Sequence, residues 1–366
     1  MAGRVFWALE GVARRVARSS RCVPALAGRG SLAALVAVAL MGCGADEAEP
    51  TPGLSPADLD HHFDPISLEP GFEDAGTCLS WTLHNEEELW VHRVDGFNGG
   101  GWHHSNWFFV AEDDYPGEDG AWDCEARGFD LVRAGLRGGV FFAQSTQATH
   151  DIQQFPEGAA FRIPPRSRVV GQAHLFNTSA RPIESGFQFE VRTLPAEQVT
   201  EVLRPISMTN MLLDIPPQSR SRFDMSCPIA PSYQEQLGTT PDFELFYVLP
   251  HYHELGAGLR LSMVGGTRDD VTIFETRGGV GDPLGATLNP PVRFAGAEGV
   301  RLTCEYDNPR DVAVGYGIGD QEMCVFLAFT NSPLTLAATS FGVNQERGLE
   351  AGVHVFDTPC LPLAVP

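Results

Sequence analysis

Two histidine pairs have the spacing of metal ligands. In His251-Tyr252-His253 the imidazoles alternate, so on a strand both project to one side and can chelate one ion. His103 and His104 are adjacent, and adjacent strand residues point to opposite faces. They can share an ion only where the backbone bends, and residues 99–101, all glycine, supply that freedom.

Two further residues extend these pairs into candidate ligand sets. His174 follows Gln172 on one face of an apolar segment, although a hydrogen-bonded structural histidine explains it equally well by itself. Met323 directly precedes Cys324 and lies about 70 residues after the second His pair. Imidazole with thioether is a soft donor set that suits Cu(I) better than Zn or Mg.

The segments around these residues predict strands. Short apolar runs are broken by turn residues, and the 39 Gly and 27 Pro suit an all-β chain with many turns. One series covers 89–94, 107–110, 139–143, 168–176 and 186–191, and a second covers 243–249, 258–264, 270–274, 299–306, 323–329 and 352–356. Only 196–203 suggests a helix. We predict two tandem β-sandwich domains, 69–195 and 196–366.

In order and interval these motifs resemble the copper type II, ascorbate-dependent monooxygenases, the family of peptidylglycine α-hydroxylating monooxygenase and dopamine β-monooxygenase. The similarity rests on these motifs, in chain order: His103-His104, Gln172-x-His174, His251-x-His253 with Leu255-Gly256, and Glu322-Met323-Cys324. It implies two jelly-roll-like sandwiches, each with one copper, facing each other across a solvent-filled cleft.

The resemblance also implies the ligands and disulfides. His103, His104 and His174 would hold the electron-supplying copper. His251, His253 and Met323 would hold the copper where dioxygen reacts and the substrate C–H bond is broken, with ascorbate or another one-electron donor as co-substrate. The implied pairs are Cys78–Cys124, Cys304–Cys324 and Cys227–Cys360; the residues alone allow 15 pairings of these six cysteines.

Three positions depart from the peptide-amidating branch of the family. That branch grips a substrate carboxylate with an Arg two residues before His-x-His, and with an Asn and a Tyr after the Met. Leu249, Val325 and Leu327 stand there in this chain. An apolar wall does not offset the desolvation of a carboxylate, so we expect a small, more apolar substrate rather than peptidylglycine.

The first 42 residues are typical of an export signal. Six Arg precede an apolar run at 32–41 that is too short to span a bilayer. The run ends in Leu40-Met41-Gly42-Cys43, which resembles a bacterial lipobox with Cys43 as the lipidated residue. We expect a lipid-anchored protein of the bacterial envelope, at the outer membrane, with residues 43–68 as a flexible tether. An ordinary signal peptide that happens to contain Cys43 is the alternative.

Composition excludes some functions and leaves others open. The chain has 366 residues, 43% of them hydrophobic. It contains 25 basic and 47 acidic residues, and this excess of negative charge disfavours binding to nucleic acid. A copper-binding lipoprotein that stores or delivers the metal would use the same ligands as an oxygenase. A zinc hydrolase would use the five histidines, but Met323 argues against it.

Overall fold

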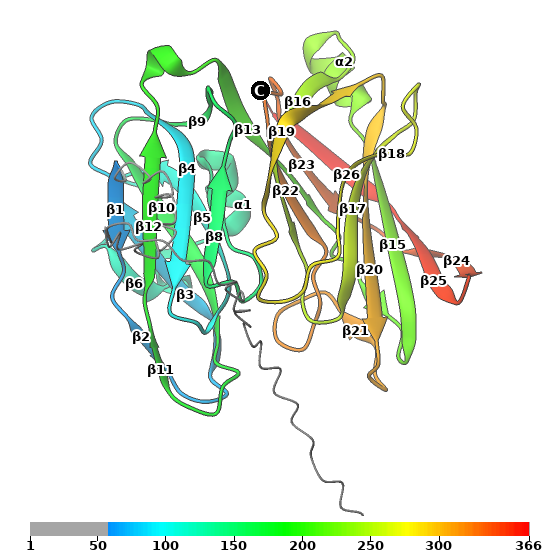
Figure 1. Cartoon of the computed structure of the whole chain (residues 1–366), viewed down its shortest axis with the longest axis horizontal. Coiled ribbons are helices and arrows are strands. Elements are labelled where there is room, and N and C mark those ends of the chain that lie inside the picture. The colour runs from blue at the N-terminus through cyan, green and yellow to red at the C-terminus, as the bar shows by residue number, and fades with distance from the viewer. Residues whose placement is uncertain (1–57, 366) are drawn as a thin grey trace, which may run out of the picture. The chain divides into compact units, whose positions relative to one another are not determined.

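Most of the described chain forms strands in which buried residues alternate with half-exposed ones. In β12 (Phe187–Thr193) the two Phe and the Val are buried while the residues between them are partly exposed. The structure is a computed structural model that describes residues 58–365 (Figure 1). The predicted signal peptide 1–42, the lipidation site Cys43 and the first part of the tether lie outside the described residues.

The first sandwich contains a five-stranded sheet packed against a second sheet. The order of the first is β6 (Gly120–Asp123), β3 (Glu73–Thr82), β10 (Ser167–Phe176), β5 (Trp102–Ala111) and β7 (Gly139–Ala143). The facing strands are β1 (Leu59–His62), β12, β4 (Leu89–Asn98) and β9 (Ala159–Ile163), with β8 (His150–Gln154) beside β4. Trp107 of β5 packs on Phe187 and Phe189 of β12, with ring centroids 5.3 and 4.8 Å apart, so aromatic rings fill the space between the sheets.

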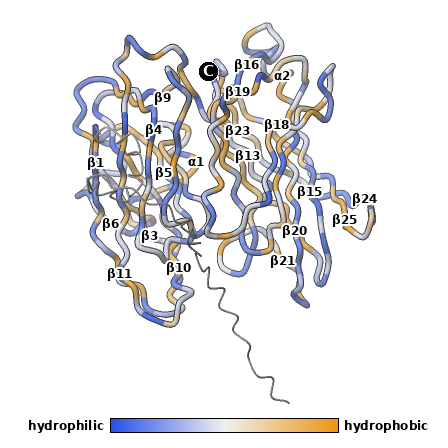
Figure 2. The backbone as a smooth tube through the Cα atoms, in the orientation of Figure 1, coloured by the Kyte–Doolittle hydropathy of each residue, from blue (hydrophilic) through white to orange (hydrophobic). Residues whose placement is uncertain are grey.

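The second sandwich is built in the same way. One sheet contains β13 (Glu201–Thr209), β22 (Val325–Thr330), β16 (Asp242–His251) and β19 (Ala286–Ala295), with β23 (Thr335–Ser340) beside β13 and β26 (Cys360–Val365) at the edge. The other has the order β18 (Val271–Thr276), β17 (Gly256–Val264), β20 (Gly299–Asn308), β15 (Ser219–Pro228), β25 (Val353–Thr358) and β24 (Gln345–Glu350). Figure 2 shows hydrophobic positions alternating with hydrophilic ones along these strands.

One sheet continues through both sandwiches. Residues Glu201, Val202 and Leu203 of β13 pair in parallel with Ala159, Ala160 and Phe161 of β9. The predicted boundary at 195/196 therefore lies just before a strand that joins the two halves. The helix expected at 196–203 is a single 3₁₀ turn, η2 (Ala196–Gln198), followed by β13.

Short elements complete the fold. Two α-helices, α1 (Leu131–Arg137) and α2 (Ala230–Leu237), were not predicted, and neither has more than eight residues. The remaining elements are η1 (Glu125–Arg127) and two small two-stranded sheets, β2 (Ile66–Leu68) with β11 (Ile183–Ser185) and β14 (Asp214–Ile215) with β21 (Val314–Gly315). No helix among residues 58–365 has the length and hydropathy to span a bilayer.

The predicted all-β class, with two jelly-roll-like sandwiches, is confirmed. Part of the predicted tether is folded. β1 pairs with β12 and β2 pairs with β11, so residues 59–62 and 66–68 lie in strands of the folded body rather than in a tether. β1 is a mostly polar strand held at a sheet edge by backbone hydrogen bonds, and β2 has only three residues, too few for apolar periodicity to reveal, although Leu68 is buried. The three disulfides implied by the family resemblance are confirmed: Cys78–Cys124, Cys227–Cys360 and Cys304–Cys324.

Candidate metal centre

Strands β5 and β10 bring the first three histidines together. His103 and His104 are the second and third residues of β5, and His104 lies opposite His174 in the register of β10. The turn before β5 needs its glycines: at Gly101 φ is +73°, and an added Cβ would lie 2.6 Å from Cδ1 of Leu68. All three imidazoles are buried, with exposures of 2 to 8%.

The second pair lies at the turn between β16 and β17. His251 ends β16, and both His251 and His253 are buried. Gly256 begins β17, where a Cβ would lie 2.1 Å from Cδ2 of Tyr252. Residue 256 must therefore be glycine, because any side chain there would collide with the ring of Tyr252, the residue that stands between His251 and His253 in the sequence.

Glu322 fixes the backbone of this turn. Its two carboxylate oxygens accept hydrogen bonds from the backbone N–H groups of His253 and Leu255, at 2.9 and 2.6 Å. Burial raises the pKa of the Glu322 carboxyl to about 7, although these backbone N–H groups act in the opposite direction. Glu322 thus holds the second His pair against the segment that carries Met323.

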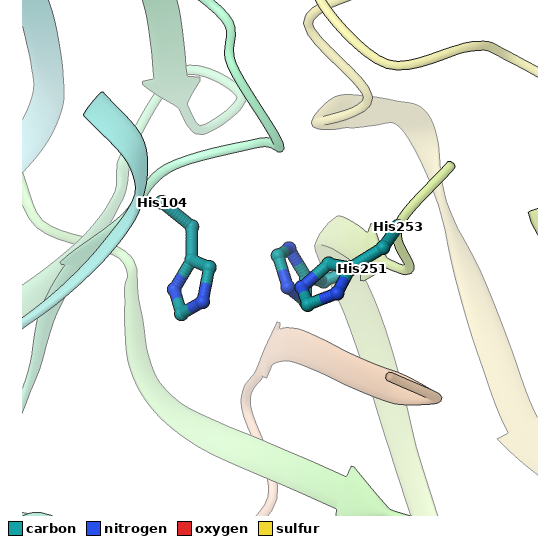
Figure 3. A group of neighbouring side chains, drawn as sticks. All are labelled: His104, His251 and His253. Atoms are coloured by element: carbon teal, nitrogen blue, oxygen red, sulfur yellow. The ribbon is translucent and has the colours of Figure 1, made fainter. Parts of the chain in front are cut away.

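The two histidine groups are in contact. Ring centroids of His103 and His253 are 4.7 Å apart, and those of His104 and His251 are also 4.7 Å apart. Figure 3 shows the His104 ring facing those of His251 and His253. The expected solvent-filled cleft between two separate sites is therefore absent from the described residues at this point, where a single cluster of five imidazoles lies instead.

In His251 and His253, hydrogen bonds at Nδ1 leave a free lone pair on Nε2. The Gln321 carbonyl can only accept, and it lies 2.9 Å from Nδ1 of His253, so this nitrogen carries the hydrogen. The Thr146 hydroxyl donates to the carbonyl of Tyr252 at 2.7 Å and lies 3.2 Å from Nδ1 of His251. It must therefore accept from that nitrogen. In the neutral rings Nε2 is then the bare nitrogen.

The first group has a carboxylate partner. Oε1 of Glu73 lies 2.9 Å from Nε2 of His174, which leaves Nδ1 as the lone-pair nitrogen of a neutral His174 ring. That Nδ1 lies 3.3 Å from Nε2 of His104. The amide nitrogen of Gln147 lies 3.3 Å from Nδ1 of His103. His174 and His103 are thus oriented by neighbours outside the group, and His104 is oriented by His174.

The cluster fits a bound metal. Within residues 58–365, the Nε2 atoms of His103, His251 and His253 are buried without a hydrogen-bond partner, which is costly unless something binds them. Burial lowers the pKa of all three and of His104; for His103 the pKa falls to about 3, and for His104 and His251 well below the usual range. Neighbouring imidazoles lower these pKa values further. The rings are neutral at pH 7 and bind a metal without releasing a proton.

The segment that carries Met323 is joined to the second pair through its neighbour Glu322. Its carbonyl accepts a hydrogen bond from the Tyr306 hydroxyl at 2.6 Å, and its backbone N–H donates to Glu322. The residue is half-buried and precedes Cys324, whose disulfide to Cys304 anchors the segment. The backbone that carries the predicted thioether ligand is therefore fixed next to the turn that carries His253.

Sequence reasoning missed the residues that orient the rings. Glu73, Thr146 and Gln147 lie far along the chain from the histidines they contact, and their types carry no motif. Gln147 has a φ of +56°, a left-handed conformation that is uncommon for a residue with a side chain and clusters at functional sites. The structure alone places these three residues at the centre.

Comparison with known proteins finds only distant structural similarities. No family model and no curated protein matches the sequence. Similar solved structures include naturally occurring empty particles of cowpea mosaic virus (9% identity, 73% of this chain and 89% of that chain, TM-score 0.36). The major capsid protein P2 of bacteriophage PM2 is 8% identical over 74% of this chain and 97% of that chain, with a TM-score of 0.26. The exported protein XepA of PBSX is 8% identical over 76% and 88%, with a TM-score of 0.21. At these TM-scores the similarities carry no inference about what this chain does.

Proposed function

We propose that the protein is a copper-dependent monooxygenase that hydroxylates a C–H bond of a small organic substrate, using dioxygen and a one-electron reductant. The observation that carries the proposal is the cluster of five buried imidazoles, three of which present an Nε2 atom that no described residue hydrogen-bonds. In this proposal Cys43 carries the lipid that anchors the exported protein to the envelope.

The ligands divide as the family resemblance implies. His103, His104 and His174 hold one copper, and His251, His253 and Met323 hold the other. Bound copper supplies one-electron transfer and the activation of dioxygen, and the softer set with the thioether suits Cu(I). The protein contributes neutral rings, fixed tautomers and a buried site with little access to water.

Apolar residues next to the second pair support an apolar substrate. Leu249 pairs with Leu327 across β16 and β22, and Val325 pairs with His251. Leu249 and Leu327 are buried, so this wall has no group that could pair with a carboxylate. The proposal therefore excludes a substrate that is held by a terminal carboxylate at this position.

The test is coupled turnover by the copper-loaded protein. Oxygen uptake is followed with ascorbate and a panel of small apolar and aromatic substrates, and hydroxylated product is quantified. We expect product in proportion to oxygen consumed, its loss in Met323→Ala and His253→Ala, and its retention in His92→Ala, a histidine that is bonded to Ala159 instead. Absence of coupled product across the panel would overturn the proposal.

A second candidate is a copper-binding protein without turnover. The ring contacts between the two groups favour it, because a substrate between His104 and His251 would first have to separate them. X-ray absorption of the reduced protein and product analysis distinguish the two. Two coppers with a sulfur scatterer and coupled product support the oxygenase, whereas tight binding with no product supports the store.

A further inference from the structure

We infer that the first metal ion to bind is shared by the two histidine groups, held by His104 together with His251 and His253. This shared site takes one ligand from the first sandwich and two from the second. This inference takes from the proposed function only that the metal is copper, and it does not require catalytic turnover.

The geometry singles out these three side chains. One ligand nitrogen from each lies within 4.8 Å of the others, and residues 58–365 contain this one group of three or more metal-binding side chains at such spacing. Two nitrogens bound to one ion at about 2.0–2.1 Å in tetrahedral geometry lie about 3.4 Å apart. Figure 3 shows the three rings facing one another, so their nitrogens need to approach by at most about 1.4 Å to reach that spacing.

Two of the three nitrogens are already prepared for the ion. The Gln321 carbonyl and the Thr146 hydroxyl fix the hydrogens of His253 and His251 on Nδ1. Their Nε2 lone pairs are buried and have no partner among the described residues. An ion between them therefore displaces no hydrogen bond.

The other members of the first group are placed less well for a shared ion. His174 is bonded to Glu73 through Nε2 and faces His104 through Nδ1. The Nε2 atom of His103 has no partner among the described residues either, but His103 does not belong to the group of nitrogens that lie within 4.8 Å of one another. His104 is the member whose ring reaches both His251 and His253, with centroids 4.7 and 5.7 Å away. A later ion in the first group would have to compete for His104, so the shared site predicts two distinguishable stages of loading.

The experiment measures the first equivalent of Cu(II) added to the metal-free protein. Affinity is measured by competition with a chelator, and bound imidazoles are counted by pulsed electron paramagnetic resonance. We expect three imidazoles in the wild type and a loss of more than about 100-fold in affinity for His104→Ala and for His251→Ala, because loss of even an outer partner costs 10–100-fold. His103→Ala, next to His104 on the same strand, should weaken the first equivalent far less than His104→Ala, and His92→Ala, a histidine bonded to the Ala159 carbonyl, is the control that should leave it unchanged.

Each alternative has its own pattern. If the first ion occupies the first group alone, His103→Ala and His104→Ala weaken it equally and His251→Ala has no effect, which overturns the inference. If it occupies the second pair alone, only His251→Ala weakens it, which also overturns the inference. Circular dichroism and unfolding of each metal-free variant confirm folding, and His104→Asn replaces any variant that unfolds. Turnover of the fully loaded protein is scored separately, so failure of the shared site and failure of the oxygenase proposal are distinguishable.

Discussion

Oε1 of Glu73 lies 2.9 Å from Nε2 of His174, a carboxylate–imidazole pair at the inner end of the first sandwich. A carboxylate at this position fixes the tautomer of a metal-binding ring and raises its basicity. We predict that Glu73→Ala weakens copper binding by the first group about 10–100-fold, while Glu73→Gln, which keeps an acceptor, loses less. Copper competition assays check this, with the exposed Glu87→Ala as control. Equal affinities for wild type and Glu73→Ala would contradict it.

Thr146 has the corresponding role for the second pair. Its hydroxyl accepts from His251 and donates to the carbonyl of Tyr252, so Thr146→Val removes both contacts without a change of shape. We predict copper binding at the second pair weaker by about 10–100-fold, and unfolding free energy lower by about 1–3 kcal/mol, because a buried carbonyl loses its partner. Thr149→Val, exposed in the same loop, is the control and should change neither quantity.

The buried carboxyl group of Asp151 should make the free energy of unfolding depend on pH. It is buried, and burial raises the pKa of its carboxyl to about 6, although two hydrogen bonds from Ser145 act in the opposite direction. The folded protein therefore binds this proton more tightly than the unfolded chain does. Its contribution is most favourable below about pH 4 and is lost as pH rises to about 6, by about 3 kcal/mol in all.

Urea unfolding of wild type and Asp151→Asn between pH 4 and pH 7 isolates this contribution, since other titrating groups cancel in the difference. The free energy of unfolding of the wild type should fall relative to Asp151→Asn across this range. A difference that stays constant with pH would show that Asp151 does not titrate as described.

Two of the disulfides should differ in their effects: both stabilise the fold, but only one should also affect metal binding. Cys304 and Cys324 are 20 residues apart, and Cys227 and Cys360 are 133 apart. Chain-entropy arguments predict that replacing each pair by Ala costs about 3 and about 5 kcal/mol, respectively. Only loss of the 304–324 bond should also weaken Cu(I) binding, because Cys324 directly follows Met323. Unfolding curves and Cu(I) competition on both double variants test this; equal effects on copper would contradict it.

The class of fold was predictable because strand periodicity is a local property. Alternation in segments such as β12 marks both the strand and its buried face. The entry of β1 and β2 into the body was not predictable, since β1 is mostly polar and held at a sheet edge by backbone hydrogen bonds, and β2 is too short to show a period. The pairing of β9 with β13 was also hidden, because parallel pairing links segments about 40 residues apart and leaves no local sign.

The candidate site was predictable in its ligand types and less so in its arrangement. The His-x-His spacing predicted that His251 and His253 act together, and both are in the cluster, although His253 lies in the turn after β16 and not on the strand. That His104 would contact them depends on how the two halves pack, which no short motif encodes. The orienting side chains Glu73 and Thr146 were missed for the same reason.

The parallel pairing of β9 and β13 also limits how the protein can be dissected. Cutting the chain at residue 195 would leave the backbone groups of Ala159–Phe161 and Glu201–Leu203 unpaired at freshly exposed sheet margins. Such margins recruit strands from other molecules. Fragments made to study one histidine group alone would therefore tend to self-associate, and single-site chemistry is better isolated by point substitutions in the intact chain.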